Sequence, residues 1–166
     1  MTTLDELIDE HNPCGQARTW LEAEGITTPE QAWEKCRNPT WLLWWLDKIG
    51  YRDERVMRLW GCWSVRQIWD QLTDARSRRG VEVSERYASG LATEEEFGDA
   101  RAAAIAAHAA AKPAHAEWTA SMAARGQWVS ASWGAARLSE SPDDACAAQC
   151  DRLRELINPP FGGGQS

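Results

Sequence analysis

The chain has 166 residues, the size of one compact domain, and a formal net charge of −7 from 18 Lys and Arg against 25 Asp and Glu. With 43% hydrophobic and 26% charged residues, the composition excludes a collagen, a disordered tail and a membrane-spanning protein. The deficit of basic residues argues against direct nucleic-acid binding, because contacts to phosphates require a surplus of Lys and Arg.

The first residues of the chain and the number of cysteines indicate in which cellular compartment the protein is found. The first residues are acidic and lack the basic and apolar regions of a signal peptide. The apolar run 41–46, which no other apolar run exceeds in length, is far shorter than the roughly 20 residues that cross a bilayer. The number of cysteines is odd, at five, which favours reduced thiols over a disulfide framework. We therefore expect a cytoplasmic protein that does not associate with membranes.

In chain order, capping residues predict six helices in the first half of the sequence. Thr28, Thr40 and Asp53 are placed as N-caps, and a glycine or an Asn-Pro pair follows most of the predicted ends. The helix that starts after Thr40 is apolar on every side, so we expect it in the middle of the core. The predicted ranges are 3–11, 14–24, 29–37, 41–49, 53–72 and 74–89.

The second half is rich in Ala, the strongest helix former. Thr93 and Glu96 form a capping box that opens this stretch, and more than half of residues 100–124 are Ala. Pro113 should kink or split the helix. Gly126 and Gly134 weaken the prediction of a helix around Trp128 and Trp133, and a last helix covers about 142–157.

No segment alternates apolar and polar residues with the period of two that marks a half-buried strand. We therefore predict an all-α fold, a compact bundle of about eight helices with no sheet. A single domain, 1–157, would combine a Trp-rich half, 1–92, with an Ala-rich half, 93–157, around one core. Residues 158–166 should form an irregular Pro/Gly tail.

The sequence carries no motif for catalysis or cofactor binding. It has no Gly-rich phosphate loop, no nucleophile elbow and no His-Glu-x-x-His pair, so we predict a non-enzymatic protein without a cofactor. Cys146 and Cys150 lie four residues apart and, with His108 and His115, offer the ligands of a zinc site. The spacing is uncommon for structural zinc and Pro113 disturbs the His geometry, so we interpret these cysteines as a packing face instead.

The Trp set and a neighbouring group of arginines suggest a binding surface. Eight of the 11 Trp lie between residues 20 and 69. Arg55 and Arg66 are eleven residues apart and share one helical stripe beside Trp63, where they suit a phosphate and a stacked base. Alternatively, these arginines lie on solvated faces and pair with nearby acids. The candidate binding residues are Arg55, Arg66, Trp63, Trp60 and Arg58.

Several short motifs follow one another in a recognisable order along the chain. They are His11-Asn12-Pro13-Cys14, Pro29–Trp33, Trp41–Trp44, Glu85–Gly90, the Ala-rich stretch and Leu153–Ile157. In this order the chain resembles a group of small Ala/Trp-rich helical proteins of actinobacteria and their phages, partly similar to immunity proteins that neutralise toxins. The resemblance implies an accessory protein of phage–host conflict. It assigns no functional residue, because the shared motifs are helix caps and turns.

Two functions from different classes remain open. In the first, the protein binds and restrains a protein partner in a defence, counter-defence or immunity setting, through an exposed Trp/Arg patch. In the second, it is a sponge that takes up a nucleotide-like small molecule in a Trp/Arg-lined groove. A flat patch with an exposed Trp at its centre favours the first, and a concave pocket with Arg beside Trp favours the second.

Overall fold

The computed structural model describes residues 4–110 and 115–157. These residues form ten α-helices and one short 3₁₀-helix without any strand, which confirms the all-α prediction with a slightly larger number of helices. Pro113 and the predicted tail, 158–166, lie outside the described residues. The α-helices are α1 Leu4–His11, α2 Gly15–Ala23, α3 Pro29–Lys35, α4 Pro39–Lys48, α5 Glu54–Arg66, α6 Ala75–Ala88, α7 Glu94–Ala110, α8 His115–Ala124, α9 Trp128–Leu138 and α10 Pro142–Leu156.

Most helix starts follow the predicted caps. The Thr28 hydroxyl accepts a hydrogen bond from the backbone N–H of Gln31, and Asp53 caps α5 in the same way through its carboxylate. The capping box at α7 is complete, because Glu96 accepts from the Thr93 N–H at 2.8 Å and donates its own N–H to the Thr93 hydroxyl at 3.1 Å. Local side-chain chemistry therefore sets these boundaries.

Two predicted helices differ from the structure. The N-cap of α4 is Asn38 rather than Thr40, because the Asn38 side chain accepts from two backbone N–H groups and Pro39 occupies the first helical position. The predicted helix 53–72 stops at Arg66 and continues, after a break, as the 3₁₀-helix Trp69–Gln71. Among the described helices, none has both the length and the apolar character needed to cross a membrane.

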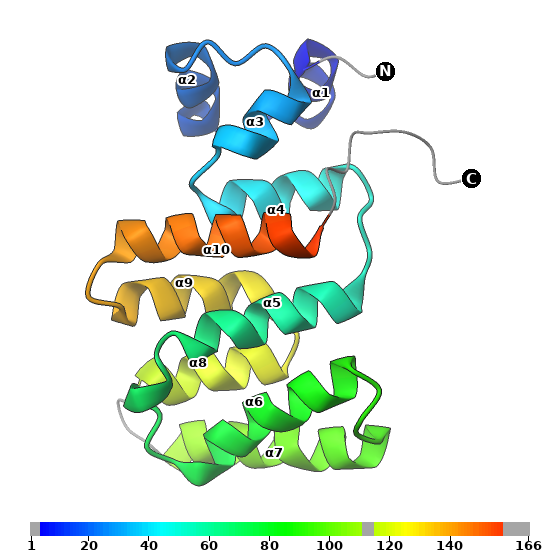
Figure 1. The fold of residues 1–166 in the computed structure, drawn as a ribbon, viewed down its shortest axis with the longest axis vertical. Coiled ribbons are helices and arrows are strands. Elements are labelled where there is room, and N and C mark those ends of the chain that lie inside the picture. The colour runs from blue at the N-terminus through cyan, green and yellow to red at the C-terminus, as the bar shows by residue number, and fades with distance from the viewer. Residues whose placement is uncertain (1–3, 111–114, 158–166) are drawn as a thin grey trace.

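The helices form an elongated stack (Figure 1). Helices α1, α2 and α3 lie at one end, and the antiparallel pair α6 and α7 lies at the other. Between them, α4 and α10 lie side by side, followed by α5 and α9 and then by α8. Residues far apart in sequence, such as those of α4 and α10, therefore come into contact.

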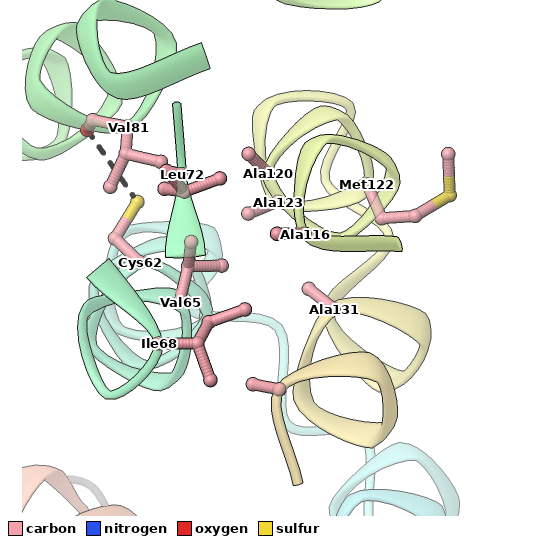
Figure 2. Packing of buried hydrophobic residues seen from close by; sticks show 11 residues of the cluster. Cys62, Val65, Ile68, Leu72, Val81, Ala116, Ala120, Met122, Ala123 and Ala131 are labelled. Carbon is pink, nitrogen blue, oxygen red and sulfur yellow. Dashed lines mark hydrogen bonds between the residues drawn. The ribbon is translucent and has the colours of Figure 1, made fainter. Parts of the chain in front are cut away.

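The Ala-rich helices pack closely against α5 and α6. Val65, Ile68 and Leu72 face Ala116 and Ala120 of α8 (Figure 2), and all five are buried. Branched aliphatic side chains thus pack against the alanines, and the half-buried Trp69 and Trp118 pack against the same cluster. The cluster takes residues from both halves of the chain.

A second cluster surrounds Trp60, which is fully buried on α5. Its indole N–H donates to the backbone carbonyl of Gln149 at 2.8 Å, so the polar group of the ring is satisfied inside the core. Helix α4 contributes Leu42, Leu43 and Leu46 to the buried residues, whereas its three Trp are only half-buried. The expectation that α4 is buried on every side is therefore wrong: one face is open, and this face forms a cavity.

Candidate functional site

The two arginines predicted to hold a phosphate are bonded within the chain. Arg66 on α5 donates two hydrogen bonds to the carboxylate of Glu85 on α6, at 2.9 and 2.6 Å. This bidentate pair raises the pKa of Arg66, chiefly through the hydrogen bond to Glu85. Arg55 donates from Nε to the carbonyl of Ala88, at 2.8 Å, and so bonds the last residue of α6. Both guanidinium groups connect α5 to α6.

Arg58 is enclosed by aromatic rings. Its guanidinium carbon lies 4.5 Å from the ring centroid of Phe97, 5.2 Å from that of Trp128 and 5.4 Å from that of Tyr87. Tyr87 and Phe97 are themselves stacked, with centroids 4.6 Å apart. Arg58 thus joins α5 to α6, α7 and α9 through cation–π contacts, and it is half-buried among these rings.

The remaining predicted residues, Trp60 and Trp63, do not form a surface patch either. Trp60 has no exposed surface, so its assignment to a binding patch is wrong. Trp63 is half-buried, one turn before Gln67, whose side chain bonds the Trp63 carbonyl. Helix α5 crosses the middle of the stack (Figure 1), and its buried face carries Trp60. Of the other predicted residues on α5, Arg55 is exposed, and Trp63 and Arg66 are half-buried.

An exposed apolar surface is found on α9 instead. Trp133 is 53% exposed and Val129 is 45% exposed. Arg137 follows at the same spacing of four residues, which places all three on one face of the helix, and its guanidinium carbon lies 4.7 Å from the Trp133 ring centroid. We call Val129, Trp133 and Arg137 the α9 patch.

The α9 patch is presented by a closely packed pair of helices. A Cβ at Gly134 would lie 2.4 Å from the Thr119 hydroxyl oxygen and 3.0 Å from the Trp118 ring, so only glycine allows α8 and α9 this approach. Trp118 meets Trp133 edge to face, with centroids 6.4 Å apart and an angle of 78°. These contacts hold the Trp133 ring in place although half of it faces solvent.

A groove of about 520 Å³ adjoins the α9 patch at Val129. It runs between the turn that joins α4 to α5 and the start of α9, and Tyr51, Met57 and Trp128 contribute to its walls. Burial, together with the nearby charge of Asp53, raises the pKa of Tyr51, so the phenol stays protonated at neutral pH. The exposed patch thus continues into a concave surface with mixed polar and apolar walls.

A second concave site lies along another face of α4, from Thr40 to Lys48. Helices α1–α4 enclose a cavity of about 270 Å³, lined mainly by apolar atoms. Its lining includes Trp20, Trp41, Trp44 and Trp45, and Trp20 and Trp41 pack against each other with ring centroids 5.6 Å apart. We call this the tryptophan cavity. The sequence predicts that the helix carrying Trp41, Trp44 and Trp45 lies in the middle of the core, but these three side chains are only half-buried.

Lys48 and two cysteines also line the tryptophan cavity. The Lys48 ammonium lies 5.9 Å from the Trp44 ring centroid and 3.9 Å from the exposed carboxylate of Asp47. Cys36 is buried, and this burial raises the pKa of its thiol, whereas Cys14 is exposed. Lys48 is the only charged residue among the described residues that line the cavity.

The proposed ligands of a zinc site are not gathered into one. Within the described ranges, no group of three or more His, Cys, Asp or Glu is close enough to hold a metal ion. Cys150 is buried in the cluster around Trp60, and burial raises its pKa, whereas Cys146 is half-buried. His115 is exposed at the start of α8.

A buried carboxylate was missed by sequence analysis. Glu117 on α8 is 1% exposed and accepts hydrogen bonds from the backbone N–H groups of Thr73 and Asp74, at 3.0 and 3.1 Å. It therefore binds the turn before α6, a structural role. A Glu within an Ala-rich stretch was the only sequence signal, and it does not reveal which backbone groups lie opposite.

No protein-family model, curated protein or solved structure matches this chain significantly. The resemblance to Ala/Trp-rich proteins of actinobacteria and their phages therefore stays a prediction.

Proposed function

We propose that this chain is a non-enzymatic protein that binds and restrains a protein partner through the α9 patch. The observation that carries the proposal is Trp133, the one exposed Trp among those that the structure describes. Trp and Arg are the residue types that contribute most often to the energetic centres of protein interfaces. The setting, in defence, counter-defence or immunity of a phage or an actinobacterium, rests on the sequence resemblance alone.

The geometry of the α9 patch suits a preorganised interface. Contacts with Trp118 and Arg137 already restrict the Trp133 ring, so binding would cost little side-chain entropy. A partner with an apolar pocket for the indole, and an acidic side chain next to Arg137, would bury both groups together. The groove next to Val129 extends the surface that such a partner could cover.

The alternative, a sponge for a nucleotide-like signal on α5, has less support. It requires Arg55 and Arg66 to bind a phosphate together, but Arg66 is already held by Glu85 in a bidentate pair. Arg55 is exposed and donates only its Nε, to the carbonyl of Ala88. An incoming phosphate would first have to separate Arg66 from a bidentate carboxylate. The geometry on α5 therefore favours a structural role over ligand binding.

Site-specific crosslinking tests the proposal. A photoreactive p-benzoylphenylalanine at Val129 should give a crosslinked adduct with the partner in the cells that naturally produce the protein. The same group at Leu91, which is 68% exposed on the turn between α6 and α7, serves as a matched control and should give none. Trp133→Ala should remove the adduct formed from position 129, because the central anchor is lost.

The crosslinking result can also contradict the proposal. Equal adducts from positions 129 and 91, or an adduct at 129 that survives Trp133→Ala, would show that the α9 patch does not select a partner. An adduct with the mass of two identical chains would identify self-association instead. Because Trp133→Ala also removes the contacts with Trp118 and Arg137, the thermal unfolding midpoint should fall by a few degrees, and circular dichroism verifies that the variant is folded at the temperature of the crosslinking.

A further inference from the structure

We propose that the tryptophan cavity binds a small aromatic acid, that is, a planar molecule of one or two fused rings that carries a carboxylate. This site lies among α1–α4 and is separate from the α9 patch, so either proposal can be correct without the other. The proposal rests on the size of the cavity, the nature of its walls and the position of one charge.

The size of the cavity limits the ligand. Its volume is about 270 Å³, just below the range of about 300–1,000 Å³ in which most drug-sized ligands bind. A molecule of one or two rings fits such a space. A whole nucleotide needs more room and further partners for its phosphate, and the described lining has no arginine.

The walls favour an aromatic ring over a flexible chain. Four indole rings, from Trp20, Trp41, Trp44 and Trp45, contribute to the lining. Aromatic pairs prefer offset-stacked or edge-to-face arrangements and contribute beyond the area that they bury. Trp20 and Trp41 are tilted by 47° to each other, so a planar ligand that stacks on one ring would be inclined by the same angle to the other.

The single charge in the lining favours an anion. Lys48 brings a positive charge to a wall that otherwise consists of apolar, Cys and Thr residues. The carboxylate nearest to it, from Asp47, is 63% exposed and lies 3.9 Å away, so this pair is weak. A carboxylate on the ligand would meet the ammonium group of Lys48, whose side chain is 37% exposed, so water partly screens their attraction.

The test uses 1-naphthoate as the probe, and 1-naphthalenemethanol as a neutral molecule with the same ring system. Isothermal titration calorimetry of the whole chain should show saturable binding of 1-naphthoate and weaker binding of the alcohol. Lys48→Met should weaken 1-naphthoate binding by roughly 3- to 10-fold, the scale of one partly screened ion pair, without affecting the alcohol. Lys35→Met is the control, because Lys35 is exposed on α3 outside the lining, and it should change nothing.

Filling the cavity provides a second variant. Ala17 lines the cavity, and Ala17→Phe places a ring where the ligand would lie, so binding of both probes should fall more than 10-fold. Absence of saturable 1-naphthoate binding up to millimolar concentration would overturn the proposal. So would unchanged binding to a folded Ala17→Phe variant. Equal affinities for the acid and the alcohol, together with no effect of Lys48→Met, would overturn the assignment of a carboxylate.

Cysteine protection keeps the proposal testable if Ala17→Phe does not fold. Cys14 is exposed and lines the cavity, so a bound ligand should slow its alkylation several-fold. Cys146 lies outside the lining on α10 and should react at an unchanged rate, which makes it the internal control. Slowing of both thiols to the same extent, or of neither, would contradict occupation of this cavity.

Discussion

The two ends of the stack fill the space between their helices in different ways. At the end made of α6–α9, small residues allow the backbones to approach: a Cβ at Gly80 would lie only 2.8 Å from the Cβ of Ala104. At the end made of α1–α4, indole rings occupy the positions between helices, and a cavity of about 270 Å³ remains. Protein interiors are normally close-packed. We therefore attribute the cavity at the α1–α4 end to the shape of the side chains that meet there.

The comparison shows that large side chains do not necessarily fill the space between helices better than small ones. Ala and Val side chains pack together around Ala120, whereas four indole rings at the other end line a space that they do not fill. The end with the cavity also depends on a specific tie to the rest of the stack. Arg154 on α10 donates to the carbonyl of Trp33 at 2.9 and 2.7 Å, and to that of Cys36, and so binds the end of α3 to the stack.

The largest expected effect comes from the same substitution made at each end. Ala120→Leu adds three carbons at a position with no exposed surface in the close-packed cluster, so it should destabilise the fold by about 1–3 kcal/mol or more. Ala17→Leu adds the same atoms next to the tryptophan cavity, where there is space, and should change the unfolding free energy by less than about 1 kcal/mol. Urea unfolding of both variants measures the difference.

An equal loss of stability in the two variants would break the comparison, because it would mean that the cavity is not available space. The Ala17→Leu substitution should also reduce binding of 1-naphthoate, which links this variant to the ligand proposal. Ala102→Leu, on the exposed face of α7, is the control for the change in helix propensity and should have almost no effect.

A smaller effect is expected when a single carbon is added to a glycine at each end. Gly134→Ala places a Cβ 2.4 Å from the Thr119 hydroxyl oxygen, and the shift of α8 against α9 should cost about 1–2 kcal/mol in spite of the better helix propensity. Gly15→Ala, in the first turn of α2, has no heavy atom within 4 Å of the new Cβ and should be neutral or slightly stabilising. Thermal unfolding compares the two. A stable Gly134→Ala variant would show that α8 and α9 tolerate a wider separation.

Local helix signals were sufficient for most of the fold. Caps such as Asp53 and the Thr93–Glu96 box act within a few residues, so the sequence alone locates them. Gly134 shows where such signals mislead. It was interpreted as a weakness of the helix, but α9 runs through it, because its missing side chain makes room for α8. Which residues pack against a glycine depends on the tertiary structure and cannot be predicted from the neighbouring residues in the sequence.

The candidate site was harder to predict for the same reason. Residues such as Arg66 and Trp60 have the chemistry of a binding site, and their spacing along α5 was correctly seen to be helical. However, their availability depends on the helices that cover α5, namely α6 for Arg66 and α10 for Trp60. Trp133 carried no sequence feature that distinguished it from the other ten Trp. Its exposure follows from the outer position of one face of α9, which only the assembled stack reveals.

The smallest expected effect concerns two ion pairs, one between α5 and α6 and one within α4. Arg66 and Glu85 form a bidentate pair between α5 and α6, with side chains 36% and 30% exposed. A double-mutant cycle with Arg66→Met and Glu85→Gln should give a coupling energy of about 0.5–1 kcal/mol, reduced by solvent screening and lowered further in 1 M salt. The cycle is needed because Arg66 also stacks 4.0 Å above the Trp69 ring, a contact that Arg66→Met alone would remove.

The matched cycle at the other end uses Lys48→Met and Asp47→Asn, whose charged groups lie 3.9 Å apart on the surface. Asp47 lies closer to Arg52, at 3.3 Å, so the coupling between Asp47 and Lys48 should be near zero. This difference has a functional consequence. A cation without a strong partner can attract the carboxylate of a ligand, whereas one that is tightly paired, like Arg66, cannot do so without losing its partner. A large coupling energy at Lys48 and none at Arg66 would contradict this difference. Lys48 would then be held by Asp47, and Arg66 would be available to bind a phosphate.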